Sequence, residues 1–345
     1  MFTKNNFISK RPFFIAELSG NHKGDINKAK KLIFFAKKNG ADAVKLQTYT
    51  PEMMTLKQAN FKIKKGMWAK KKLWDLYKSA HTPLSWHKEL YKYADKVNIK
   101  IFSTPFSIEA VDFLEKLKTK IYKISSFEMN DLNLVKRIAE TKKTVIMSTG
   151  MANLIEISES VNVLRKYGCK HLILLYCVSN YPSNYNEYNL NNISILKKKF
   201  NCTVGLSDHS IGSEIACMSI IQGAEIIEKH ICLDNIHTVD SKFSLKVSDM
   251  RKFSDDIKNA FNLKKNKLYL IPKSQKDNKI FRRSIYAIKN IEKGDKFSSE
   301  NIKTFRPNLG LSASNFIKII GKKSPQNIKK NSVLKKTLMK KLNIN

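Results

Sequence analysis

Residues 13–49 read FFIAELSGNHKGDINKAKKLIFFAKKNGADAVKLQTY. Two apolar runs, 13–18 and 41–49, enclose a stretch with helical periodicity. The apolar residues of that stretch fall on one stripe, and a glycine follows where the helix would end: Ile26, Ala29, Leu32, Ile33, Ala36 and then Gly40. Strands that are apolar on both faces are typical of a parallel sheet covered by helices. The stretch therefore predicts a strand–helix–strand unit.

The same alternation continues to about residue 231. Short runs rich in β-branched residues recur at 13–18, 41–49, 97–104, 120–126, 144–149, 171–178, 202–208 and 224–231. Helix-patterned stretches separate these runs, and Ser107 and Asp131 stand where N-caps are expected. An open, doubly wound sheet is the alternative, but no GxGxxG follows the first run. Because eight parallel strands can close on themselves, we predict a (β/α)8 barrel, the TIM-barrel architecture.

Two segments do not fit the repeat. The connection 50–82 is longer than a compact domain usually needs and holds two of the three Trp, so we expect a partly helical flap over the barrel mouth. After about residue 262 the chain becomes polar, and short strand-like runs separated by turn signals follow. We therefore predict a barrel domain at 1–262, a linker at 263–280 and a small β-rich domain at 281–345.

The composition excludes disordered and fibrous proteins, because 42% of the 345 residues are hydrophobic and only 12 are Gly and 8 are Pro. The net charge of +35 raises the alternative of a basic binding protein. The positive residues are spread along the whole chain, however, and no nucleic-acid-binding motif is present. We therefore expect no nucleic-acid partner and interpret the charge as solvated faces that steer anionic substrates inward.

The sequence also predicts a cytoplasmic protein without a membrane segment. No apolar stretch approaches the roughly 18 residues of a membrane span. The first ten residues, MFTKNNFISK, lack the apolar centre of a signal peptide. The five Cys form no CxxC pair, which favours reduced buried thiols over a disulfide framework.

The carboxyl ends of the strands meet at one mouth of such a barrel, where the active site lies. Lys45 and Lys123 lie near that mouth, inside otherwise apolar strands. A buried ammonium group is costly unless it is paired or serves a ligand. Three interpretations are open: a structural Lys–Glu pair, a clamp for a phosphate or carboxylate, and a Schiff-base lysine of a barrel aldolase.

His209 and His230 end two neighbouring strands. A single histidine on a strand is more often a satisfied core residue. Two at adjacent strand ends can reach one point about 2.0–2.1 Å from a nitrogen of each ring. The pair predicts a divalent metal with open coordination positions, and we expect the neighbouring Asp208 and Glu228 to orient the two rings.

Seven segments together resemble the sialic acid synthase family over nearly the whole chain. They are AELSGNHKG (16–24), AVKLQTYTP (43–51), YKISSFEMND (122–131), MSTGMA (147–152), GLSDHS (205–210), IEKHICLD (227–234) and FRPNLGLS (305–312). Members of that family join a (β/α)8 barrel to a C-terminal antifreeze-like (SAF) domain. They condense phosphoenolpyruvate with an open-chain N-acetylated amino sugar, releasing phosphate and forming a nine-carbon 2-keto-3-deoxy acid, a nonulosonic acid.

The resemblance implies a role for each matched residue. Glu17 would lie beside the reacting carbons, and His209 and His230 would bind Mn²⁺ or a similar divalent ion, Mg²⁺ or Co²⁺. The phosphoenolpyruvate site would comprise Lys45, Gln47, Thr104, Lys123, Ser126, Ser148 and Ser207. The sugar would contact Glu128, Tyr181, Asp240 and, from the RP loop of the SAF domain, Arg306.

Within the family, three segments are most similar to members that take 2,4-diacetamido-2,4,6-trideoxy-L-altrose: AELSGNH, LWDLYKSAHTP and DSKFSLK. Sialic and legionaminic acid synthases are the alternatives. Because that sugar lacks a C6 hydroxyl, we expect apolar surface near C6, supplied by the Trp-bearing flap and Phe243. The resemblance further implies a homodimer with swapped SAF domains, in which Arg306 reaches the sugar of the other subunit.

Overall fold

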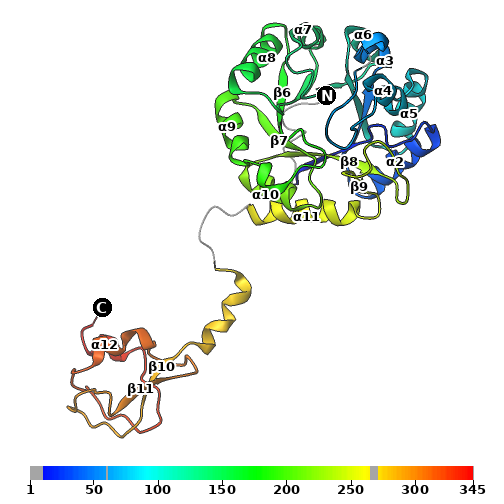
Figure 1. Ribbon diagram of the computed structural model, residues 1–345. Coiled ribbons are helices and arrows are strands. Elements are labelled where there is room, and N and C mark those ends of the chain that lie inside the picture. The colour runs from blue at the N-terminus through cyan, green and yellow to red at the C-terminus, as the bar shows by residue number, and fades with distance from the viewer. Residues whose placement is uncertain (1–10, 60, 265–270, 345) are drawn as a thin grey trace. The chain divides into compact units, whose positions relative to one another are not determined.

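The computed structural model describes residues 11–59, 61–264 and 271–344. The chain divides into two compact units, Met1–Lys265 and Asn266–Asn345 (Figure 1).

Within the described residues, the first unit is a closed barrel of eight parallel strands surrounded by helices (Figure 1). The strands are β1 (Phe13–Glu17), β2 (Ala43–Thr48), β3 (Lys100–Pro105), β4 (Ile121–Ile124), β5 (Thr144–Ser148), β6 (His171–Cys177), β7 (Thr203–Asp208) and β8 (Ile226–Cys232). Each strand pairs with the next one in the chain, and β8 pairs with β1 from Phe13↔Ile226 to Glu17↔His230. A short strand, β9 (Leu245–Lys246), pairs with the end of β8. The predicted TIM barrel is confirmed.

Amphipathic helices cover the outside of the barrel. They are α2 (Ile26–Lys38), α5 (Leu84–Lys96), α6 (Ile108–Lys116), α7 (Leu132–Glu140), α8 (Leu154–Lys166), α9 (Asn191–Phe200), α10 (Glu214–Gln222) and α11 (Met250–Lys264). Ser107 and Asp131 are N-caps, as predicted, since their side chains accept from the backbone N–H groups of Ala110 and Leu134. Among the helices in the described part of the chain, none is long and apolar enough to cross a membrane.

The barrel interior has an apolar floor and a polar mouth. Alternate residues of a strand point to the same side, and the inward residues nearest the strand starts form one buried cluster: Phe13, Ile15, Ala43, Phe102, Ile121, Ile146, Ile173, Leu175 and Ile226. The next positions in that alternation are polar: Glu17, Lys45, Thr104, Lys123, Ser148, Ser207 and Glu228. Outward residues such as Phe14 and Ala16 pack in the larger core beneath the helices. The alternation of the strands thus collects the polar residues at one end of the barrel.

The connection between β2 and β3 forms the predicted flap and is partly helical. It contains α3 (Pro51–Met54), the 3-10 turn η1 (Lys57–Ala59) and α4 (Leu73–Ala80). Between the turn and α4, Trp68 donates from Nε1 to the carbonyl oxygen of Val239 at 2.9 Å. This hydrogen bond joins the flap to the loop that follows β8, so the flap is fixed across the barrel mouth.

The second unit has a small core of its own. Strands β10 (Ser284–Ala287) and β11 (Ile302–Phe305) pair antiparallel, and η5 (Ala313–Asn315), α12 (Phe316–Ile319) and α13 (Leu338–Lys341) are short. Its hydrophobic core comprises Ile285, Ala287, Ile291, Phe297, Ile302, Leu311, Ile319, Leu334 and Leu338. Of the linker expected at 263–280, residues 265–270 lie outside the described residues. Helix α11 extends to Lys264, and the 3-10 turns η3 (Lys273–Gln275) and η4 (Asp277–Phe281) follow.

A single methyl group tests how tightly the strands pack. A Cβ at Gly205 in β7 would overlap the carbonyl oxygen of Ile226 in β8 and lie 2.8 Å from the side chain of Leu175 in β6. We expect Gly205→Ala to lower the free energy of unfolding by about 3 kcal/mol, the upper end for an overpacked core. Gly24→Ala is the control, because a Cβ there meets nothing within 4 Å although φ is +65°. Denaturant unfolding measures both, and equal losses would contradict the packing argument.

Candidate active site

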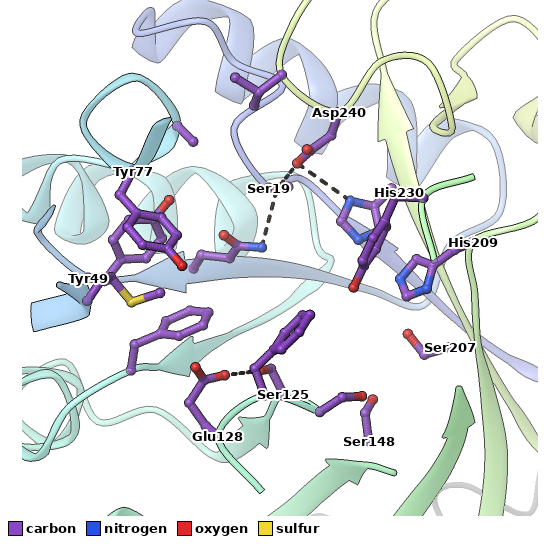
Figure 2. A pocket seen from close by; sticks show the side chains of 18 of the residues that line it. Ser19, Tyr49, Tyr77, Ser125, Glu128, Ser148, Ser207, His209, His230 and Asp240 are labelled. Carbon is purple, nitrogen blue, oxygen red and sulfur yellow. Dashed lines mark hydrogen bonds and ion pairs between the residues drawn. The ribbon is translucent and has the colours of Figure 1, made fainter. Parts of the chain in front are cut away.

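A cavity of about 410 Å³ opens at the carboxyl ends of the barrel strands (Figure 2). Most residues predicted for the site line it: Lys45, Gln47, Lys123, Ser126, Glu128, Ser148, Tyr181, Ser207, His209, His230 and Asp240. Glu17 and Thr104 lie behind them, each in contact with the ammonium group of Lys45. Arg306 belongs to the second unit, where it is exposed. One pocket therefore gathers residues that are far apart in the sequence.

One side of the pocket is a buried cluster of two lysines and two glutamates. Lys45 Nζ lies 2.6 Å from Glu17 Oε2 and 3.7 Å from Glu228 Oε1. Lys123 Nζ lies 3.3 Å from the same oxygen of Glu228, which also accepts from Ser207 Oγ at 3.1 Å. Both lysines are thus paired with glutamates, and both also line the cavity, so a bound anion could contact them.

In this cluster, burial and ion pairing shift each pKa in opposite directions. Burial raises the pKa of Glu17 and lowers that of Lys123. For Lys45 and Glu228 burial is outweighed by the opposite charges: Glu17 and Glu228 raise the pKa of Lys45, and the two ammonium groups lower that of Glu228. Glu17 is therefore the carboxylate of the cluster that more readily takes up a proton.

The predicted histidine pair has the geometry of a possible metal site. The ring centroids of His209 and His230 are 5.3 Å apart. His209 Nδ1 donates to the carbonyl oxygen of Val178 at 3.0 Å, which leaves Nε2 with a free electron pair. His230 Nδ1 is buried without a hydrogen-bond partner, and burial keeps the pKa of that ring well below its usual value, so it stays neutral. At His209 burial is outweighed, because Cys177, the carbonyl of Val178 and Asp208 raise the pKa of the ring. The free electron pair on Nε2 belongs to the neutral form of this ring, so His230 is the neutral nitrogen donor of the pair and His209 would bind an ion once deprotonated.

Asp208 and Glu228 do not hydrogen-bond to the two rings directly, contrary to expectation. Asp208 accepts from Lys229 and Ser210, and Glu228 pairs with the lysines. The carbonyl of Val178 orients His209 instead. The sequence gives the positions of these carboxylates on adjacent strands but not which neighbour each one contacts. Among the described residues no group of three or more His, Cys, Asp or Glu is placed to hold a metal, so an ion would take its other ligands from substrate or solvent.

Aromatic rings enclose the histidines. Tyr181 lies 4.4 Å from His209 between ring centroids, and Phe243 lies 4.8 Å from His230. Tyr181 in turn contacts Phe243 at 5.1 Å and Trp68 of the flap at 5.4 Å. The flap therefore covers the histidine side of the pocket through a stack of rings.

The opposite side of the pocket is largely apolar. Figure 2 shows Tyr49 and Tyr77 across the cavity from His209 and His230, with Glu128 between the two sides. Tyr49 contacts both Tyr77 and Phe106 at ring-centroid distances of 5.8 and 5.2 Å. Further apolar residues that line the pocket are Met54, Ile63, Leu73, Leu76 and Phe127. Most of them come from the flap and from the ends of β2 to β4.

The site also contains residues that the sequence analysis did not assign. Ser19 donates from Oγ to Asp240 and accepts from Gln47 Nε2 at 3.2 Å, so it links two predicted residues (Figure 2). Ser125 donates to the carboxylate of Glu128. Ser19 could have been found from its place in AELSGNH, directly after the first strand. Ser148 Oγ and Glu228 Oε2 are buried without a hydrogen-bond partner, as expected of groups that a ligand would satisfy.

Two carboxyl groups of this pocket change protonation near neutral pH: burial raises the pKa of Asp240 to about 6, and the larger value belongs to Glu128. Burial raises its pKa to about 7 from an ordinary value of 4.5. The folded protein therefore retains a proton that the unfolded chain releases, and stability falls as pH rises from about 4.5 to about 7 and then levels off.

Glu128→Gln tests this pKa, because glutamine cannot ionise. The stability of the variant relative to wild type should rise by about 2 kcal/mol between pH 4.5 and pH 8, after allowance for partial exposure. Denaturant unfolding at a series of pH values measures the difference, and the same change at the exposed Glu159 gives the background. A difference between Glu128→Gln and wild type that does not vary with pH would show that Glu128 is ionised in the folded protein.

Comparison with known proteins identifies the family. The model of the NeuB family matches residues 32–269. The chain belongs to the NeuB family. The SAF domain model matches residues 282–338, in the second unit. The expected membership of the sialic acid synthase family, with a barrel followed by a SAF domain, is therefore confirmed.

NeuB-family relatives cover nearly the whole chain. Pseudaminic acid synthase of Campylobacter jejuni is 44% identical over 94% of this chain and 96% of its own length. N,N'-diacetyllegionaminic acid synthase of the same organism is 38% identical over 94% of this chain and 99% of its own. The solved N-acetylneuraminic acid (sialic acid) synthetase of Leptospira borgpetersenii, in complex with citrate, is 30% identical with a TM-score of 0.69 and covers 78% of this chain and 90% of that one.

Proposed function

We propose that this protein is a pseudaminic acid synthase. It condenses phosphoenolpyruvate with the open-chain aldehyde of 2,4-diacetamido-2,4,6-trideoxy-L-altrose to give a nonulosonic acid and phosphate. The observation that carries the proposal is the 44% identity to a pseudaminic acid synthase across both units of the chain. The pocket supports it, because Lys45 and Lys123 can bind an anion and the apolar wall can contact a deoxy sugar.

Phosphoenolpyruvate binds at the lysine end of the pocket. Lys45 and Lys123 donate charge-assisted hydrogen bonds to its phosphate and carboxylate. Hydroxyl and amide groups supply further hydrogen bonds: Gln47, Thr104, Ser126, Ser148 and Ser207. The unpartnered oxygen of Ser148 supports this assignment.

Synthases of the NeuB family are in general metal-dependent. We propose that His209 and His230 hold the ion here, with Mn²⁺ as the preferred metal and Mg²⁺ or Co²⁺ as alternatives. A divalent ion at these rings would supply Lewis acidity to the aldehyde oxygen of the sugar.

The chemistry forms one C–C bond between the substrates and one C–O bond from water to C2, and it breaks the C2–O bond to phosphate. C3 of the enol phosphate attacks the aldehyde carbon, and C2 becomes an oxocarbenium ion. The carboxylate of Glu17, held by Lys45 and Gln47, stabilises that cation and then takes a proton from the water that adds to C2. Phosphate leaves with the oxygen that joined it to C2, and the lysines stabilise its charge. No imine is needed, which distinguishes the reaction from that of a Schiff-base aldolase.

The sugar extends from the histidines toward the apolar wall. Tyr181 and Asp240 contact it near the reacting end, and Glu128 contacts it further out. Phe243 packs against His230 at the reacting end. The apolar surface near C6 comes from the flap, as expected, through Met54 and Tyr77, and from Phe106.

The reaction itself is the first test. With phosphoenolpyruvate and Mn²⁺, the proposed altrose derivative should release phosphate and form the acid. N-acetylmannosamine should react more slowly, by up to about a hundredfold, since an apolar pocket rejects an added hydroxyl only weakly. Oxygen-18 placed in the C2–O bond of phosphoenolpyruvate should be recovered in phosphate. A sample whose metal has been removed by a chelator is the control and should release no phosphate.

Three results would contradict this assignment. Faster turnover of N-acetylmannosamine or of the legionaminic acid precursor would indicate a sialic or legionaminic acid synthase. Use of pyruvate, with inactivation by borohydride, would indicate an aldolase. An absence of turnover with every sugar would indicate a binding protein.

We also propose a cytoplasmic homodimer with swapped SAF domains. All five cysteines are free thiols, in keeping with a reducing compartment. Arg306 is exposed at the start of the RP loop, where its guanidinium group can bond an acetamido carbonyl of the sugar. In the swapped dimer that sugar lies in the partner's barrel.

Subunit mixing tests the swap. His209→Ala and Arg306→Ala should each abolish most of the activity alone. In a mixed dimer with swapped domains, one site carries both changes and the other carries neither, so up to half of the activity of a wild-type dimer should return. Exchange is followed with differently tagged subunits. If exchange is complete and no activity returns, Arg306 acts on the barrel of its own chain.

A further inference from the structure

We propose that Lys229, on the outer face of β8, is a positioning residue that holds His209 in place for metal binding. The inference rests on the proposed metal site. Glu228 and His230 both line the pocket, so Lys229 between them points to the other side of the strand. It is 1% exposed, and its ammonium group lies 5.5 Å from the ring centroid of Phe253 in α11.

The ammonium group of Lys229 is bound to the two residues that flank His209. Its Nζ donates to Asp208 Oδ2 and to the carbonyl oxygen of Ser210, both at 2.6 Å. Asp208 Oδ1 accepts from the backbone N–H of Ser210 at 2.9 Å and from its hydroxyl at 2.7 Å. These four bonds close the 208–210 turn on both sides of the histidine.

The opposite side of the turn is held as well. Tyr188 OH donates to Asp208 Oδ1 at 3.3 Å and accepts from the backbone N–H of His209 at 3.4 Å. The carbonyl of His209 accepts from Ser183 N at 3.1 Å. With its backbone fixed in this way, the ring can donate from Nδ1 to Val178 and present Nε2 to the pocket.

A purely structural role explains this arrangement less well. A buried ion pair is weak evidence for stability, because apolar replacements of similar volume are often as stable. The bonds of Lys229 go to the turn that carries one metal-binding ring, and the next residue along β8 carries the other. Consecutive residues of one strand thus set the spacing of the two rings.

The test is metal binding by the full-length protein. We expect Lys229→Met to weaken Mn²⁺ binding by 10- to 100-fold, the usual effect of removing a group that orients a metal ligand. Free Mn²⁺ is measured by electron paramagnetic resonance during titration. The KM for phosphoenolpyruvate should change by less than about twofold, since Lys45 and Lys123 are untouched, while kcat at fixed Mn²⁺ falls.

A second variant avoids leaving Asp208 buried without its partner. Lys229→Met/Asp208→Asn removes both charges and should fold, with the same loss of Mn²⁺ affinity. Lys143→Met is the matched control, because it breaks the ion pair with Glu115 away from the pocket. It should lower the melting temperature without changing Mn²⁺ affinity. His209→Ala gives the Mn²⁺ affinity that remains when one metal-binding ring is removed.

The outcomes separate this inference from the proposed function. Wild-type affinity in the folded double variant would overturn the positioning role, and so would an equal loss of affinity in Lys143→Met. Failure of the double variant to fold would assign Lys229 to folding. If wild type and His209→Ala bind Mn²⁺ equally, the metal site itself is wrong, whatever Lys229 does.

Discussion

The rest of the structure depends on the burial of two lysines and two glutamates inside a closed barrel. Moving each charge out of water costs several kcal/mol, so the cluster persists because every ammonium has a carboxylate nearby. The four charges sum to zero. An incoming phosphoenolpyruvate therefore leaves an excess of negative charge, which a divalent cation at the two histidines would offset. If the proposed sites are right, anion binding and metal binding would favour each other through charge balance.

Much of this site could be predicted from the sequence, because strand alternation and barrel closure are regular. Lys45 is the second inward residue of β2 and Glu17 the third of β1, so their approach follows from period two and parallel pairing. The partners of Glu228 could not be predicted in this way. Sequence shows that its carboxylate reaches the mouth, but the choice between a histidine and a lysine depends on distances of a few ångströms.

Contacts between loops could not be predicted from the sequence either. The hydrogen bond from Trp68 to Val239 joins two loops, and neither loop has a period from which contacts follow. In β8, by contrast, alternation gives three neighbours different contacts: Glu228 pairs with the lysines, Lys229 binds the 208–210 turn that carries His209, and His230 faces the cavity.

The position of the flap has a consequence for which part of the pocket can change. The charged end of the pocket is made by strands whose hydrogen bonds are shared around the whole barrel, so a change there disturbs the fold. Much of the apolar wall comes from an insertion between β2 and β3 that takes no part in barrel closure. Changes in the flap can therefore alter the apolar wall without breaking the strand pairing that closes the barrel.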